Sequence, residues 1–230
     1  LVETAHAELG GLDCLVNNAG VMLLGPLQGA DPAEWRRMID VNLLGLLYCT
    51  HYALPLMRDG GGGDVINVAS VAGRIASLGS GVYNMTKWGV VGYSESLRQE
   101  GALINVRVTC VEPGFVDTEL QGHNTNPLVV SEIQKLMERT PKVLEAADIA
   151  NAIVYAASQP EHVNVNEILV RPSGQAFEHD DLRLVRRRFS SRVSRRGERA
   201  HGEANVPKHP LLRREGEGLH RVWHQQPWRK

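Results

Sequence analysis

The chain has 230 residues, of which 43% are hydrophobic, and its 25 Lys and Arg nearly balance 26 Asp and Glu. This length and apolar content predict one globular domain with a sizeable core, and the charge balance excludes a strongly acidic or basic class of protein. No run approaches the roughly 18 to 20 apolar residues that a membrane span needs, so we expect no contact with a membrane.

The first residues carry no targeting signal. Leu1–His6 lacks the basic and apolar regions of a signal peptide, and the chain does not start with Met, so we expect it to begin within a longer, cytoplasmic protein. Its three cysteines, Cys14, Cys49 and Cys110, match neither a disulfide framework nor a zinc pattern. We therefore predict buried, reduced thiols and no metal site.

The first third of the chain alternates helical and strand-like patterns. Residues 1–9 predict a short helix that ends at Gly10-Gly11, and residues 12–16 predict a buried parallel strand. Asp31-Pro32 is typical of a helix start, and the helix is predicted to run over residues 35–54 and to end at Pro55.

The same alternation continues to about residue 177. The four glycines of residues 60–63 lie between a helix and a strand, whereas a dinucleotide fingerprint follows a strand and opens a helix, so they predict a flexible surface loop. Alternating strands and helices predict an α/β fold with a parallel sheet. The remaining predicted elements are a strand at 64–69, a helix at 83–103, strands at 105–111 and 168–171, and a helix at 145–158.

Ser70, Tyr83 and Lys87 form the strongest candidate site. Tyr83 and Lys87 are four residues apart on the predicted helix, so both project from one face. A cation one turn away favours the phenolate, and we expect it to lower the tyrosine pKa from its usual value near 10. Ser70 ends a predicted parallel strand, where open α/β sheets bind ligands.

Five motifs occur in a fixed order along the chain. They are Asn17-Asn18-Ala19-Gly20 after a strand, Val41-Asn42-x-x-Gly45 on a helix, Ser70 after a strand, Tyr83-x-x-x-Lys87, and Pro113-Gly114 with Thr118 after a strand. This order resembles the short-chain dehydrogenase/reductase family from residue 1 to about Phe177. The resemblance implies a Rossmann-like doubly wound parallel sheet, and Glu112-Pro113-Gly114 with the ending 166–172 is similar to the branch acting on serine, allo-threonine and clavulanate-type aldehydes.

The resemblance also implies an activity, the transfer of a hydride between a nicotinamide and a carbonyl or alcohol. Ser70 would bind the substrate oxygen, Tyr83 would exchange its proton, Lys87 would bind the nicotinamide ribose, and Asn42 would relay protons through water. Asn42 is equally interpreted as a buried amide that bonds backbone, and Asn17 as a residue that holds the sheet together. The implied cofactor-binding residues are Asn17, Ala19, Gly20, Val41, Tyr83, Lys87, Pro113, Gly114, Val116 and Thr118, and residues 119–140 would form a mobile flap over the substrate.

The family's phosphate-binding pattern, Thr-Gly-x-x-x-Gly-x-Gly, does not occur in this sequence, nor does its second strand with the acid or arginine that separates NAD from NADP. The cofactor is therefore NADP or NAD, with NADP favoured by the branch resemblance. We expect the chain as given to bind either one poorly. We also expect a fold that lacks the family's first strands.

The composition changes at Glu178. Residues 178–230 hold 14 Lys and Arg against 7 Asp and Glu, with few periodic apolar residues, which predicts a basic, disordered extension after a 1–177 dehydrogenase domain. Two alternatives to an active enzyme remain open: an inactive fragment that only folds or associates, and, less favoured, a protein that binds nucleic acid through Arg186–Arg188 and Arg195-Arg196. The apolar helices predict a homodimer or homotetramer.

Overall fold

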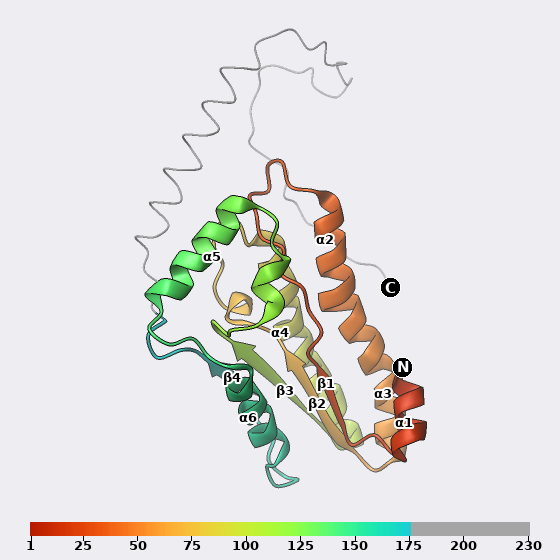
Figure 1. The fold of residues 1–230 in the computed structure, drawn as a ribbon. Helices are drawn as coiled ribbons and strands as arrows, with labels where there is room; N and C mark the ends of the chain where they lie inside the picture. The colour runs from red at the N-terminus through yellow and green to blue at the C-terminus, as the bar shows by residue number, and fades with distance from the viewer. Residues whose placement is uncertain (176–230) are drawn as a thin grey trace, which may run out of the picture. The chain divides into compact units, whose positions relative to one another are not determined.

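The computed structural model describes residues 1–175, which form a parallel sheet of four strands and six α-helices (Figure 1). The strands are β1 (Cys14–Asn17), β2 (Gly63–Val68), β3 (Val106–Pro113) and β4 (Glu167–Val170). The α-helices are α1 (Val2–Leu9), α2 (Pro32–Ile39), α3 (Leu46–Asp59), α4 (Gly81–Gly101), α5 (Pro127–Arg139) and α6 (Ala146–Ala157). The π-helix η1 (Asp40–Gly45) and the 3₁₀ turns η2 (Val71–Gly73), η3 (Ala102–Ile104) and η4 (Glu119–His123) complete them. The predictions on the extension lie outside the described residues.

Helices cover both faces of the sheet. The strands lie in the order β1-β2-β3-β4 and all pair in parallel, as the alternation of helices and strands predicts. Because successive side chains of a strand point to opposite faces, Val65 packs towards α3 and α4 while Ile66 packs against Ile149 of α6. This is the doubly wound arrangement implied by the resemblance.

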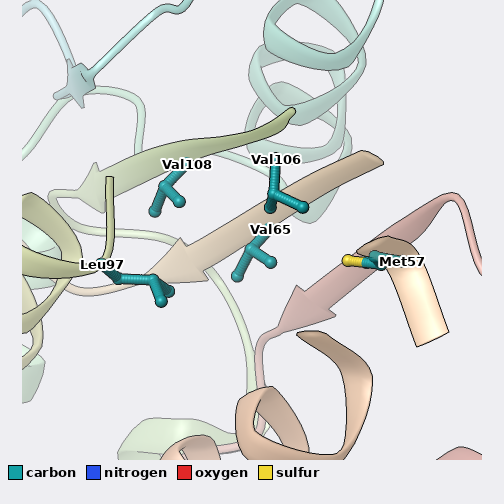
Figure 2. Close-up of a cluster of buried hydrophobic side chains, with 5 residues drawn as sticks. All are labelled: Met57, Val65, Leu97, Val106 and Val108. Carbon is teal, nitrogen blue, oxygen red and sulfur yellow. The ribbon is translucent and has the colours of Figure 1, made fainter. Parts of the chain in front are cut away.

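A cluster of fully buried apolar side chains joins one face of the sheet to α3 and α4. Figure 2 shows Met57 of α3 and Leu97 of α4 with Val65 of β2 and two valines of β3. Each is almost inaccessible to solvent, so this cluster fixes how the two long helices lie on the strands that end at the candidate site.

The helix predicted over residues 35–54 differs from prediction in two ways. It is interrupted by the π-helix η1, and α3 then continues past Pro55 to Asp59. A proline inside a helix removes one backbone hydrogen bond. The extra turn nevertheless forms because it places Met57 in the core, and burial of that side chain offsets the lost bond.

The prediction of a buried first strand, with buried cysteines, is wrong at β1. Cys14 is exposed, Val16 is partly exposed, Cys49 is half-buried, and only Cys110 is buried. Within residues 1–175 β1 pairs with β2 alone and lies at the edge of the sheet, so its apolar side chains are covered less than those of β2 and β3.

The predicted loop of four glycines is a closely packed turn. The Gly62 backbone has φ +135°, and a Cβ there would lie 2.3 Å from the Asn105 carbonyl oxygen, so only glycine fits. The Gly63 amide donates a hydrogen bond to that same carbonyl at 3.1 Å. The turn therefore sets how β2 enters the sheet beside β3.

The region of the predicted flap is mostly helical. Residues 119–140 form η4 and α5 with a short connection between them, and Figure 1 shows α5 beyond the carboxyl ends of the strands. Asn126 caps α5 by accepting a hydrogen bond from the Leu128 amide at 3.0 Å. Among residues 1–175, no helix has the length and apolar character to cross a membrane.

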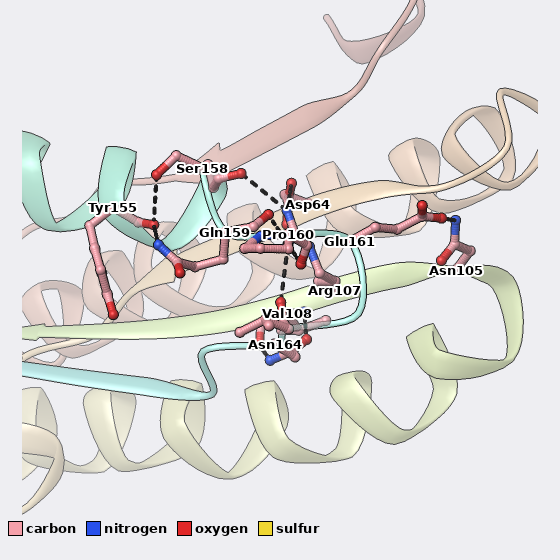
Figure 3. Close-up of polar contacts among 12 residues, drawn as sticks. Asp64, Asn105, Arg107, Val108, Tyr155, Ser158, Gln159, Pro160, Glu161 and Asn164 are labelled. Atoms are coloured by element: carbon pink, nitrogen blue, oxygen red, sulfur yellow. Dashed lines mark hydrogen bonds and ion pairs between the residues drawn. The ribbon is translucent and has the colours of Figure 1, made fainter.

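At the opposite end of the sheet, Arg107 joins the strands to the end of α6 (Figure 3). Its Nε and Nη2 atoms donate to the two carboxylate oxygens of Asp64, both at 2.8 Å. Its Nη1 atom donates to the Gln159 carbonyl at 2.8 Å. A single guanidinium thus fastens β2, β3 and the segment after α6, far along the strands from Ser70.

Candidate active site

Tyr83 and Lys87 lie in the first two turns of α4, where the helix packs on the carboxyl end of β2. Their exposed fractions are only 5% and 6%. The Lys87 Nζ atom donates a hydrogen bond of 2.9 Å to the carbonyl of Val68, the last residue of β2. The i, i+4 spacing therefore places both groups against the strand end, as predicted.

Ser70 follows β2 and meets the two residues from the strand side. Its Oγ atom accepts a hydrogen bond from the Ala72 amide at 3.1 Å, which caps η2, and lies 3.5 Å from the Pro113 carbonyl oxygen. The Ser70 side chain also interacts with the Tyr83 hydroxyl, whose pKa it acts to lower. Three segments that are separate in sequence thus meet at one hydroxyl pair.

The pKa of Tyr83 departs from the prediction. Burial raises it to about 12, and the Ser70 side chain acts in the opposite direction without reversing the shift. Burial also lowers the pKa of Lys87 to about 8. The prediction of a lowered tyrosine pKa is wrong for this structure, because burial disfavours the charged phenolate.

Asn42 occupies the π-helix between α2 and α3. Its Oδ1 atom accepts from the Val21 amide at 2.8 Å, and its Nδ2 atom donates to the Val21 carbonyl at 2.9 Å and to the Thr86 hydroxyl at 3.2 Å. The locally opened helix and the buried amide that bonds backbone are therefore both present. Thr86 precedes Lys87, so Asn42 joins the segment after β1 to α4.

The Asn17–Gly20 turn supports the same centre from the other side. The Asn17 amide nitrogen donates to Thr50 of α3 at 3.0 Å and to Asn67 of β2 at 2.8 Å, which confirms that it holds the sheet together. A Cβ on Gly20 would lie 3.4 Å from the Asn42 Oδ1 atom and 3.8 Å from the Lys87 Nζ atom. The Gly20 backbone is therefore close to the ammonium group.

The other predicted cofactor residues make separate contacts. Val41 packs against the apolar cluster that includes Tyr83, and Ala19 is exposed. Gly114 donates its amide to the Val170 carbonyl at 2.7 Å, and Val116 forms a bridge with Leu144. Thr118 is exposed and caps η4 by accepting from the Leu120 amide at 3.4 Å.

Two charged residues of this region were not singled out from the sequence as site residues. Glu112 is fully buried (0% exposed) immediately before Pro113, and Arg74 binds both of its carboxylate oxygens from the turn after Ser70. Glu112 could have been recognised in the sequence from the two-residue period of a strand, which places it on the same buried face as Cys110. A buried carboxylate requires a cation, and Arg74 is the one that meets it.

Comparisons with known proteins agree with this geometry. The family model of the short chain dehydrogenases matches residues 1–128. An uncharacterized oxidoreductase of Staphylococcus saprophyticus is 42% identical over 179 residues, which are 77% of this chain and 72% of that protein. An uncharacterized oxidoreductase of Staphylococcus aureus is 41% identical over 172 residues, or 75% and 69% of the two chains.

Solved structures give the same result. The closed form of serine dehydrogenase complexed with NADP+ aligns with a TM-score of 0.68 and 33% identity, covering 76% of this chain and 73% of that one. Serine dehydrogenase from Escherichia coli aligns with a TM-score of 0.62 and 32% identity, covering 76% and 71%. The parallel sheet with its serine, tyrosine and lysine at the strand ends is that of an oxidoreductase of the dinucleotide-binding type. The chain belongs to the short-chain dehydrogenase/reductase family.

Proposed function

We propose that the chain is an NAD(P)-dependent oxidoreductase that interconverts a small alcohol and its carbonyl compound. The observation that carries the proposal is the convergence of Ser70, at the end of β2, with the buried Tyr83 and with the Lys87 ammonium one helical turn away. This arrangement presents a donor and an acceptor to one substrate oxygen.

The residues at this centre fit the nicotinamide end of a dinucleotide. Lys87 has three ammonium donors, and the Val68 carbonyl accepts one of them, so two remain to bind ribose hydroxyls. Gly20 has no side chain to fill the space beside that ammonium. Together with Pro113, Val116 and the other residues named above, these groups would hold the cofactor.

The chain's own groups would then manage the proton while the bound nicotinamide supplies or accepts the hydride. With its pKa near 12, Tyr83 is protonated at neutral pH and is suited to donate a proton to a carbonyl oxygen as it is reduced. Ser70 would orient that oxygen by hydrogen bonding. Lys87 would be mostly cationic at pH 7, and its charge would stabilise the phenolate left after proton transfer.

We propose NADP as the cofactor and a hydroxy amino acid or a related small aldehyde as the substrate, in a cytoplasmic enzyme. The 33% identity to a serine dehydrogenase complexed with NADP+ supports the choice of cofactor and of substrate class. A 7α-hydroxysteroid dehydrogenase complexed with NADH, at 25% identity and a TM-score of 0.66, shows that the same fold accommodates another cofactor and substrate class. An inactive fragment that only folds or associates is the alternative.

The deciding experiment combines binding and turnover. NADPH and NADH are titrated separately against the purified chain by fluorescence, and turnover of L-serine with NADP+ or NAD+, and of short aldehydes with the reduced cofactors, is followed by nicotinamide absorbance. Cofactor concentrations extend to the millimolar range because the expected binding is weak. Turnover that depends on Tyr83 supports the proposal. Absence of turnover at saturating cofactor supports the inactive alternative and overturns the proposal.

A further inference from the structure

Arg74 connects three segments around the candidate site. Its Nε atom lies 2.6 Å from one carboxylate oxygen of Glu112, and its Nη2 atom lies 2.7 Å from the other, which is a bidentate ion pair. The same guanidinium also contacts the carboxylate of Glu167 at the start of β4. The turn after Ser70, the end of β3 and the start of β4 are therefore held by one side chain.

The two ends of η2 are fixed to the same strand. Ser70 caps the turn at its beginning and approaches the carbonyl of Pro113, while Arg74 follows its last residue and grips Glu112, the neighbour of Pro113. Between them the turn is closed by hydrogen bonds from the Gly73 amide to the Ser70 carbonyl and from the Arg74 amide to the Val71 carbonyl, at 2.8 and 2.9 Å. Any displacement of Arg74 would therefore be transmitted to the Ser70 hydroxyl.

The chemistry of this pair favours positioning over substrate binding. Arg74 directs its Nε and Nη2 atoms to the carboxylates of Glu112 and Glu167. These two negative charges disfavour the binding of an anionic substrate group at the same guanidinium. A buried ion pair adds little stability relative to apolar side chains of the same shape. What a bidentate pair adds is a defined distance and orientation.

We propose that Arg74 is a positioning residue, and that its ion pair with Glu112 holds the Ser70 turn against the end of β3 and so fixes the position of the Ser70 hydroxyl. The role in catalysis rests on the proposed function, whereas the mechanical role does not. Arg74 acts through Ser70 and does not contact the reacting atoms.

The mechanical role is tested first, without activity, by hydrogen exchange of the backbone amides of residues 73–75. Arg74→Met is expected to raise their exchange rate about 10-fold or more, because it removes the charge-assisted hydrogen bonds that hold the turn against the end of β3. Arg74→Lys keeps the charge but not the bidentate geometry and is expected to restore part of the protection. Unchanged exchange in Arg74→Met overturns the proposal.

Arg107→Met is the matched control, because it breaks the other bidentate pair, with Asp64, at the opposite end of the sheet. It is expected to destabilise the protein and to leave exchange of residues 73–75, measured relative to the rest of the sheet, as in wild type. An equal rise in both variants would mean that Arg74 contributes only to general stability, and the proposal would fail.

A double variant separates the effect of the ion pair on the position of the Ser70 turn from its effect on the stability of the protein. Arg74→Met combined with Glu112→Met leaves no unpaired buried charge, so stability is expected to return close to wild type. Fast exchange at residues 73–75 is expected to persist, because the apolar pair does not fix the turn. Recovery of wild-type protection in this double variant contradicts the proposal.

If the wild-type chain turns over substrate, a mutant cycle tests the route through Ser70. Arg74→Met is expected to lower kcat at least about 10-fold with a smaller effect on the KM for the cofactor. In a Ser70→Ala background the same change is expected to have little further effect, because the hydroxyl that it positions is absent. Fully additive losses would show that Arg74 acts by another route. If the wild type has no activity, the proposed function fails. Hydrogen exchange alone then tests the mechanical role of Arg74.

Discussion

The ammonium nitrogen of Lys87 lies 5.9 Å from the centre of the Tyr83 ring, one turn further along α4. The two side chains are close enough to interact, yet each is shifted towards its neutral form, with the pKa of Tyr83 raised and that of Lys87 lowered. Burial is the first cause for both. Tyr83 is therefore a proton donor that lies beside the Lys87 cation. Because burial disfavours the charge on Lys87, protonation of this lysine affects the stability of the fold as well as the chemistry of the site.

Replacing Lys87 with Met should change how stability depends on pH. The unfolded chain holds the lysine proton up to its ordinary pKa of 10.5, and the folded chain only to about 8. The unfolded state thus binds more protons between these values, so the Lys87 contribution to stability rises with pH, by up to about 1.4 kcal/mol per unit. Urea unfolding of wild type and Lys87→Met at pH 7, 8, 9 and 10 measures this contribution to the free energy of unfolding.

The difference between the two proteins isolates Lys87, because the remaining titrating groups are common to both. Wild type is expected to gain stability relative to Lys87→Met as the pH rises from 8 to 10. Parallel pH curves would show that Lys87 is not desolvated as the structure indicates. Tyr83 acts in the opposite direction above pH 10, where its folded form retains a proton that the unfolded chain has lost.

Catalysis makes a separate prediction for Tyr83. Tyr83→Phe keeps the ring and removes the hydroxyl, so turnover should fall about 10²-fold or more, while cofactor affinity changes little. Initial rates and cofactor titration on the same preparations measure the two effects. Tyr155→Phe is the matched control, because the Tyr155 side chain of α6 is 57% exposed, and it should retain wild-type turnover. Normal turnover in Tyr83→Phe would remove the residue from its proposed role.

The sequence was most informative where function depends on local spacing. The Tyr83-x-x-x-Lys87 pattern needs only the helix period to place both groups on one face, and the chain order of parallel strands places Ser70 at the same edge. The interpretation of Asn17 and Asn42 as buried amides that hydrogen-bond the surrounding structure is also confirmed. These features depend on periodicity and motif type, so they can be predicted without knowledge of the tertiary contacts.

Tertiary contacts decided what the sequence left undetermined. Arg74 and Glu112 are 38 residues apart and have no common period, so their pairing depends on how η2 folds back on β3. The direction of the Tyr83 pKa shift depends on burial, which the i, i+4 spacing does not encode. At Pro55, local propensity predicted a helix end, but burial of Met57 two residues later outweighed it.

The hydrogen bonds of Asn42 should be worth more than those of its neighbour Thr86. Asn42→Leu leaves the buried Val21 amide and carbonyl without their partner, and each such group costs about 1 to 3 kcal/mol. Thr86→Val leaves both Val21 bonds in place and should cost about 1 kcal/mol. Urea unfolding of the two variants gives the comparison. A smaller loss in Asn42→Leu than in Thr86→Val would contradict the network described here.

Two methionines allow a direct test of the core. Met57 is fully buried between α3 and the sheet, so Met57→Ala should lower the free energy of unfolding by about 2 to 5 kcal/mol (Figure 2). Met85 is 54% exposed on α4, and Met85→Ala should change stability by less than about 0.5 kcal/mol. Denaturant unfolding of both measures the difference. Similar losses would show that α3 does not pack on the sheet beyond Pro55.

The last prediction concerns self-association through α3 and α4. Tyr48 and Tyr52 are one turn apart on α3, Met85 and Trp88 are three residues apart on α4, and all four are more than half exposed. Large apolar side chains in such a stripe favour a protein partner, and a second copy related by a two-fold axis would present the same stripe.

We therefore expect a dimer or tetramer at micromolar concentration, measured by sedimentation velocity, and expect Trp88→Glu to weaken it because the interface would then bury a charge. Leu103→Glu is the control, since Leu103 is 86% exposed in the 3₁₀ turn η3, outside the stripe. A wild type that sediments as a stable monomer contradicts the prediction. Equal weakening by both substitutions would show that association does not occur through this stripe, because a charge outside it should leave the interface intact.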